Sequence, residues 1–287
     1  MNSKIFCSVL FGKGNPFNKM VSLCTYVPVR LLRGALVHLA EKMYKTKEIS
    51  KGEKLGLLLA KSKVKNLPLF LKLPDGNTIY LPLLDMSTFI AFIDVYDHAE
   101  YEKFYVPKNG DIILDVGAHI GAFTLKTCRF NRNGLVVAVE PDPHNFELLR
   151  KNVQLNSCCE RVILVNAVLS DKNGHCTFYR NECFSAGSSL TTKREYSRQV
   201  DTKAFKLDSL VDELRLKRID FLKVDAEGAE LEITRGAERA LREQLIRNMA
   251  IAAYHVSEQR REQIIKMLKS CEYRIISTFD NIIYAAA

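Results

Sequence analysis

Glycines and carboxylates at regular spacing give the first indication of chemistry in this chain of 287 residues. Asp115 lies at the end of an apolar run and is followed by Gly117 and Gly121, four residues apart. A second apolar run ends at Glu140, 19 residues after Gly121. Glycine lets the backbone approach a ligand closely, and a carboxylate at this spacing can accept both hydroxyl protons of a ribose. The pattern therefore predicts a cofactor that contains a nucleoside.

The type of cofactor follows from what the turn lacks. A dinucleotide site needs three glycines in the pattern G-x-G-x-x-G, with bare amides facing the pyrophosphate. Here two glycines stand in G-x-x-x-G behind Asp115, which would repel a pyrophosphate and attract a cation. S-adenosylmethionine carries an ammonium and a sulfonium and keeps the ribose that Glu140 requires. We therefore predict S-adenosylmethionine; the alternative is a structural glycine turn with an incidental acid.

The predicted cofactor site extends to both sides of the turn. Pro141 and Asp142 fit a turn that covers the adenosine, and the backbone of His119 matters more than its ring. Asn166 and Ala167 are placed either to line the adenine edge or to serve as ordinary strand-end residues. The predicted cofactor-binding residues are Asp115, Gly117, Ala118, His119, Gly121, Glu140, Pro141, Asp142, Asn166 and Ala167.

A second group of ionisable residues follows two later strands. Asp225 and Glu227 stand two apart where one strand ends, and His255 follows the next. Neighbouring strand ends in a parallel sheet are about 5 Å apart, so these side chains are expected to converge. Methyl transfer to a hydroxyl needs a general base, for which Glu227 is the first choice and His255 the second. Asp225 would orient the substrate or the methionine end of the cofactor; a divalent metal site or purely structural roles are the alternatives, and no metal is predicted.

The elements that must position these residues alternate between strands and helices from residue 107 to residue 287. This alternation predicts a doubly wound, mostly parallel α/β sheet, which binds ligands beyond the carboxyl ends of its strands. The expected strands are 111–116, 135–139, 162–166, 219–224, 249–254, 273–276 and 282–285. The expected helices are 121–129, 143–155, 229–244 and 258–270, with a hairpin-like insertion at 175–206.

Two further segments precede this core. Residues 68–106 are expected to form a hairpin around Pro74-Asp-Gly-Asn77 and an aromatic-rich helix over 89–104. Residues 1–67 carry 13 of the 42 Lys and Arg residues but only 3 of the 33 Asp and Glu residues, so the net charge of +9 belongs to this helical extension. Its segment 27–47 is predicted to be an amphipathic helix that either contacts an anionic membrane or partner, or packs on the catalytic body, which is favoured.

The composition favours a cytoplasmic protein. The eight cysteines contain no C-x-x-C pair and no metal-ligand spacing, so reduced thiols are expected, with disulfides as the less favoured alternative. No stretch approaches the roughly 20 apolar residues of a membrane-spanning helix, and no signal peptide is expected.

The chain resembles the FkbM family of methyltransferases over residues 69–285. The resemblance rests on Gly110-Asp-Ile-Ile-Leu-Asp-Val-Gly-Ala-His-Ile-Gly121, Val139-Glu-Pro-Asp142 with Asn145-Phe-Glu147, Asn152 with Leu155-Asn156, Ser188-Ser189-Leu190, Leu207-Asp208 and Asp220-Phe-Leu-Lys-Val-Asp-Ala-Glu-Gly-Ala-Glu230. It implies a seven-stranded class I (Rossmann-like) methyltransferase fold. It also implies O-methylation of a hydroxyl on a sugar, glycolipid or natural product. The sequence departs from the family at Tyr254-His255, where many members have an acidic residue shortly before the histidine.

The sequence is consistent with three functions. The favoured one is S-adenosylmethionine-dependent O-methylation of a small-molecule, glycan or lipid-linked hydroxyl. The second is RNA methylation, with the basic extension holding phosphates; it is disfavoured because aromatic residues do not interleave with the basic ones there. The third is a module that binds the cofactor without turnover.

Overall fold

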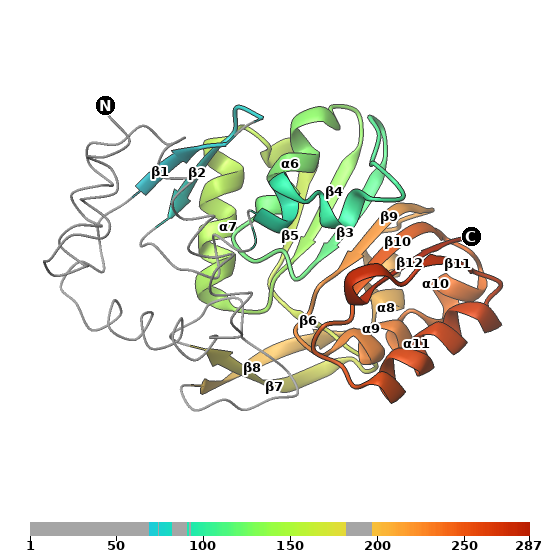
Figure 1. Ribbon diagram of the computed structural model, residues 1–287. Coiled ribbons are helices and arrows are strands. Elements are labelled where there is room, and N and C mark those ends of the chain that lie inside the picture. Colours follow the sequence, from blue (N-terminus) through green and yellow to red (C-terminus); the bar gives the residue numbers. More distant parts are fainter. Residues whose placement is uncertain (1–68, 74, 82–90, 92, 182–196) are drawn as a thin grey trace, which may run out of the picture. The chain divides into compact units, whose positions relative to one another are not determined.

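The computed structural model of this chain describes residues 69–73, 75–81, 91, 93–181 and 197–287 (Figure 1). The predicted basic extension 1–67, with its amphipathic segment 27–47, lies outside the described residues. So do the segment Ser188–Leu190 of the family resemblance and the start of the predicted aromatic helix.

A seven-stranded sheet forms the centre of the described chain, with the order β5-β4-β3-β9-β10-β12-β11. The first five strands of this order run parallel, and β12 is antiparallel to both of its neighbours. The doubly wound, mostly parallel α/β sheet predicted from the sequence is therefore confirmed. Its strands are β3 (Ile112–Val116), β4 (Leu135–Val139), β5 (Val162–Val165), β9 (Ile219–Val224), β10 (Ile246–Ala252), β11 (Arg274–Ser277) and β12 (Ile282–Ala286).

Helices cover both faces of the sheet, and each face has its own hydrophobic core (Figure 1). On one face pack α6 (Ala122–Phe130) and α7 (Pro143–Leu155), through residues such as Leu125 and Leu149. On the other pack α8 (Leu207–Glu213), α9 (Glu230–Gly236), α10 (Glu238–Arg242) and α11 (Glu258–Ser270). Among the described residues, no helix is long and apolar enough to cross a membrane.

Helices α7 and α11 have the bounds that the sequence predicted, because local capping defines where they begin. Asp142 accepts hydrogen bonds from the backbone amides of His144 (2.8 Å) and Asn145 (3.3 Å), and Pro143 occupies the first helical position. Ser257 caps α11 by accepting from the amide of Arg260 at 3.4 Å.

Two predicted elements have other bounds in the structure, and one helix of the structure was not predicted. The helix expected over 229–244 is broken into α9 and α10 at Ala237, next to Gly236, where a Cβ would lie 2.0 Å from the carbonyl oxygen of Ser170. The strand expected to end at Tyr254 ends at Ala252, so His255 lies in the turn that follows. Helix α8 was not predicted, because its seven residues are too few for a clear periodicity.

The insertion after β5 forms a separate three-stranded sheet with the order β6-β8-β7. The predicted hairpin is its antiparallel pair, β7 (Gly174–Asn181) and β8 (Ser197–Phe205). The short β6 (Val168–Leu169) pairs with β8 in parallel. This pairing holds the insertion beside the carboxyl end of β5, where β6 follows directly.

The predicted N-terminal hairpin is present as the antiparallel strands β1 (Leu69–Lys72) and β2 (Thr78–Leu81). It is held against the C-terminal end of α7 by Asn152 and by Asn156, the residue that follows the helix. The side-chain oxygen of Asn152 accepts from the amide of Tyr80, and that of Asn156 accepts from the amide of Thr78, both at 2.7 Å. Their side-chain amides donate back to the carbonyls of Tyr80 (3.4 Å) and Thr78 (2.7 Å). The two side chains thus pair with alternate residues of β2 as a strand would.

The predicted aromatic-rich helix over 89–104 is not a continuous helix in its described part. Ala91 is α-helical, and a π-helical turn η1 (Ile93–Asp97) and a 3-10 turn η2 (Glu100–Glu102) come after it. Ala99 between them has φ of 47°, in the left-handed region, which ends the helical path. This break turns Tyr101 towards the sheet, where it is buried.

Replacing Asn152 by Leu should destabilise the protein by about 2–3 kcal/mol, because the amide of Tyr80 and the carbonyl of Ile120 lose their buried partner. Urea unfolding measures the loss. Gln154→Leu on the exposed face of the same helix is the control and should change stability by less than about 0.5 kcal/mol. Equal stability of the two variants would contradict the docking role.

Candidate active site

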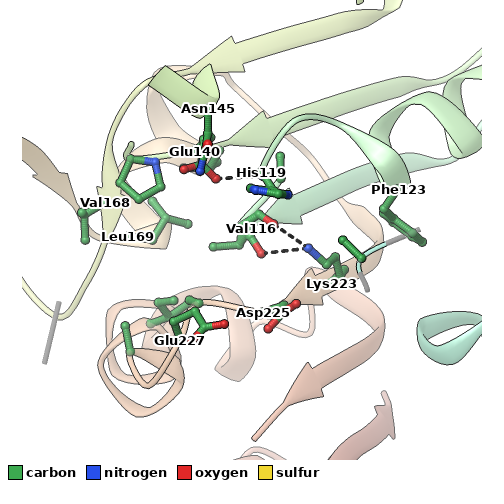
Figure 2. Close-up of a pocket in the computed structure, with 18 of the residues that line it drawn as sticks. Val116, His119, Phe123, Glu140, Asn145, Val168, Leu169, Lys223, Asp225 and Glu227 are labelled. Carbon is green, nitrogen blue, oxygen red and sulfur yellow. Dashed lines mark hydrogen bonds between the residues drawn. The ribbon is translucent and has the colours of Figure 1, made fainter. Parts of the chain in front are cut away.

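A cavity opens where the carboxyl ends of β3, β4 and β9 meet (Figure 2). The central strand β3 lies between β4 and β9, so the chain leaves it in one direction and later returns on its other side. This is the switch point at which doubly wound sheets bind ligands. In Figure 2, Glu140 and His119 lie on one side of the cavity, and Lys223 and Asp225 lie across from them.

An ion pair buried at the floor of this cavity joins the two central strands. Lys223 of β9 is in register with Asp115 of β3, and its ammonium lies 2.9 Å from Oδ1 of that carboxylate. The other oxygen, Oδ2, accepts from the hydroxyl of Thr124 at 2.6 Å. Lys223 also donates to the carbonyl of Gly117 at 2.8 Å. Lys223, not Asp115, lines the cavity, although the sequence analysis gave the lysine no role.

The two glycines of the turn allow other parts of the chain to pack where a side chain would otherwise lie. A Cβ on Gly117 would lie 1.8 Å from the carbonyl oxygen of Asp225, so β3 and β9 could not end side by side. A Cβ on Gly121 would lie 2.7 Å from the side chain of Leu149, which packs α7 against α6. Both glycines have positive φ, of 77° and 98°. Gly117 lines the cavity together with Ala118.

Glu140 reaches the cavity from the end of β4 and is held by backbone amides. Its Oε2 accepts from the amide of His119 at 2.8 Å, and its Oε1 accepts from the amide of Asp142 at 2.9 Å. His119 presents this amide from a left-handed conformation, with φ of 54°. Burial raises the pKa of Glu140 to about 8, with a further contribution from the nearby charge of Asp142.

The remaining predicted cofactor residues fall into two groups. Pro141 and Ala167 line the cavity, beside apolar side chains that include Val168 and Leu169. Asp142 caps α7 and forms an ion pair with Arg180 of the insertion at 3.1 Å. Asn166 is exposed and donates to the carbonyl of Glu140 at 2.8 Å.

The residues predicted for the reacting end lie at the other side of the cavity. Glu227 and His255 come together, with 3.3 Å between Oε2 and Nε2. Glu227 lines the cavity and its side chain is 19% exposed, whereas that of His255 is 42% exposed. Asp225 also lines the cavity and accepts a hydrogen bond from the hydroxyl of Tyr101 at 2.8 Å.

Two carboxyl groups that the sequence analysis missed lie close to Asp225. Burial, together with the charges of Glu100 and Asp225, raises the pKa of Asp94 to about 8. Burial is also the main cause of the raised pKa of Glu100, whose carboxylate accepts from the hydroxyl of Tyr254. The sequence did show two acids, Asp94 and Glu100, within an aromatic-rich segment. Because that segment was predicted to be one helix, their position beside Asp225 could not be foreseen.

The family follows from a comparison with known proteins. Residues 115–275 match the model of the methyltransferase FkbM domain, which begins at the buried aspartate of the turn. The chain belongs to the FkbM methyltransferase family. It is therefore a methyltransferase, as the resemblance implied, and the reading as a module without turnover is not supported.

Curated relatives that are methyltransferases by name agree with this assignment. Methyltransferase sdnD of Sordaria araneosa is 30% identical over 192 residues, which is 56% of this chain and 72% of the relative. The 31-O-demethyl-FK506 methyltransferase FkbM of Streptomyces tacrolimicus is 22% identical over 73% of this chain and 90% of its own length. Fibrillarin of Aeropyrum pernix, solved with S-adenosyl-L-methionine, is similar with a TM-score of 0.40 and 19% identity, covering 64% of this chain and 70% of its own.

Replacing Lys223 by Met should destabilise the protein by about 3–5 kcal/mol, because Asp115 is left as a buried charge without its partner. Chemical unfolding measures this, with Lys217→Met at an exposed position as the control. The double variant Asp115→Asn/Lys223→Met should recover part of the loss, since the uncompensated charge is removed. A Lys223→Met protein as stable as the control would contradict the role of the ion pair.

Proposed function

We propose that this methyltransferase transfers the methyl group of S-adenosylmethionine to a hydroxyl of a small polyhydroxylated acceptor, with Glu227 as the general base. The observation that carries the proposal is the Glu227–His255 pair at the edge of the cavity. A carboxylate paired with an imidazole can accept the hydroxyl proton during in-line displacement. The FkbM relative acts, by its name, at an oxygen of its own substrate.

The residues that line the cavity support S-adenosylmethionine as the cofactor. Glu140 offers a buried carboxylate to a ribose, at the strand end where such an acid binds ribose hydroxyls. Pro141, Val168 and Phe178 offer apolar surface to an adenine ring. When bound, the cofactor supplies an electrophilic methyl group on a sulfonium.

The methionine end of the cofactor is assigned to Asp225. This is one of the two roles that the sequence predicted for Asp225. Asp115, which the sequence predicted to attract the cationic cofactor, has its oxygens engaged by Lys223 and Thr124 at the floor of the cavity. Asp225 lines the cavity, and one of its oxygens accepts from Tyr101. Burial is the main cause of the raised pKa of Asp94 and Glu100, and the charge of Asp225 contributes to both. An ammonium bound beside Asp225 would favour the ionised forms of these two carboxyl groups.

Acidic and hydroxyl-bearing side chains at the reacting end favour a hydroxylated acceptor. Asp225, Glu227 and Tyr101 line this end, and sugar hydroxyls can donate to such carboxylates. The same charges would repel the phosphates of a nucleic acid, which supports a small-molecule or glycan acceptor over RNA. The predicted membrane contact of segment 27–47 stays a prediction.

Cofactor binding should release a proton at neutral pH. Because burial raises the pKa of Glu140 to about 8, its carboxyl is protonated in the free protein below that pH. Ribose hydroxyls donate to the ionised form and lower this pKa, so affinity should rise with pH by up to about tenfold per unit and level off above about pH 8. Calorimetry in buffers of different ionisation enthalpy measures the released proton.

The control for proton release is Glu140→Gln, which keeps the volume and cannot titrate. Its cofactor affinity should be weaker and should depend less steeply on pH over the same range, with the remaining dependence coming from Asp94, whose pKa is also about 8. If the binding enthalpy of the original protein does not depend on the buffer, the assignment of Glu140 is wrong. If the folded protein does not bind S-adenosylmethionine, the proposed cofactor is wrong.

Replacing Glu227 by Gln should lower turnover by about 100-fold or more while leaving cofactor affinity nearly unchanged, because the base acts only on the acceptor proton. Transfer of a tritiated methyl group to lipid, glycan, RNA and protein fractions of a cell extract first identifies the acceptor class. The same assay then compares Glu227→Gln with Glu238→Gln, an exposed acid on α10. Unchanged turnover in Glu227→Gln would remove Glu227 from the role, and labelling of the RNA fraction would overturn the acceptor class.

A further inference from the structure

The loop that carries Glu227 has a backbone conformation that must be held in place. Glu227 has φ of 53° and the following Gly228 has φ of 101°. For a residue with a Cβ, the left-handed region costs roughly 1–2 kcal/mol, so such a conformation persists only where surrounding contacts determine it. The direction of the Glu227 side chain therefore depends on what holds this loop.

The carboxyl group of Glu230 makes the contacts that hold it. Oε1 of Glu230 accepts from the amide of Ala226 at 3.0 Å and from that of Gly228 at 3.2 Å. These are the amides on either side of Glu227. Glu230 begins α9 and is 1% exposed, so its side chain bends back over the loop instead of extending into solvent.

Burying an acid at this position costs free energy, and the start of helix α9 does not require a buried acid. Burial raises the pKa of Glu230 to about 7, and the charge of Asp225 contributes to the increase. Within the described residues, Oε2 of Glu230 has no hydrogen-bond partner. An exposed acid in the first turn would favour α9 equally well through the helix dipole. What the buried carboxyl adds is the pair of bonds to the loop amides.

We propose that Glu230 is a positioning residue that clamps the amides of Ala226 and Gly228 and so directs the Glu227 carboxylate to His255 and the cavity. The proposal depends on the proposed function in one respect: its consequence for catalysis requires that Glu227 is the general base. Glu230 touches neither the acceptor nor the reacting atoms in this arrangement. Its effect on catalysis passes entirely through the loop.

Three substitutions separate the clamp from other roles of this residue. Glu230→Gln keeps an oxygen that can accept from both amides. Glu230→Asp keeps the acid but is one methylene shorter, so it cannot reach both amides. Glu230→Leu removes the hydrogen-bond acceptor without burying a charge. It is the replacement test if the Glu230→Asp protein does not fold. Glu238→Gln on α10 is the matched control at an exposed acid.

The readout is the titration of His255, followed by NMR, which needs neither cofactor nor acceptor. The protein has six histidines, and the spectrum of His255→Gln assigns the signal. Because a carboxylate 3.3 Å from Nε2 favours the protonated imidazole, Glu227→Gln should lower the midpoint of this titration. Glu230→Asp and Glu230→Leu should lower it by at least half as much, whereas Glu230→Gln and the control should leave it unchanged.

A double variant tests whether the effect passes through Glu227. In a Glu227→Gln background, Glu230→Leu should cause no further shift, because both substitutions remove one and the same interaction. A folded Glu230→Leu protein with the original His255 titration would overturn the proposal, and so would a further shift in the double variant as large as that of Glu230→Leu alone.

The same variants distinguish this proposal from the proposed function. If Glu227→Gln keeps full turnover while Glu227→Gln and Glu230→Leu both shift the His255 titration, the clamp stands and the base assignment fails. If Glu227→Gln loses turnover while Glu230→Leu changes neither turnover nor the titration, the base stands and the clamp fails.

Discussion

The ion pair between Asp115 and Lys223 is the constraint on which the rest of the site depends. Both side chains are almost completely buried, at 0% and 4% exposed, so each charge would be costly without the other. The pair joins β3 to β9, the two strands between which the chain reverses its winding direction. It brings the turn 117–121 and the loop 225–228 to the same edge of the sheet.

Close packing of the backbone reinforces this pair. Gly117 approaches the carbonyl of Asp225 so closely that any Cβ would collide with it, and the amide of Asp225 donates to the carbonyl of Val116 at 3.0 Å. The two strand ends are therefore packed directly against each other at this edge of the sheet. They present Lys223, Asp225 and Glu227 to the cavity.

Backbone amides carry much of the site's organisation. The amide of His119 binds Glu140 across the turn, and the amides of Ala226 and Gly228 bind Glu230 across the loop. In both places a residue with a Cβ, His119 or Glu227, adopts a positive φ. The cost of these conformations is offset by the hydrogen bonds that the backbone amides donate to buried carboxyl groups. The carboxyl groups in turn are kept at raised pKa by their burial.

The sequence alone determined the elements whose signals are local. The first and last residues of helices α7 and α11 were predicted correctly. Their N-caps and first turns are adjacent in the chain and can be read locally. Strands β4 and β9 followed from short apolar runs, and the β1–β2 hairpin from its turn residues. The turn with Asp115 and Glu140 was recognisable for the same reason, since the spacing along one strand–turn–helix unit is set by covalent geometry.

Only the tertiary structure decided which charges meet. Lys223 and Asp115 are separated by 108 residues, and Tyr101 and Asp225 by 124. No local pattern encodes such pairs, because they result from strand register and from where η2 turns after Ala99. The sequence predicted that Asp115 belongs to the site, but its neutralisation by Lys223 depends on the two strands lying in register. The physical reason is that periodicity and capping act over a few residues, whereas burial and ion pairing depend on the completed sheet.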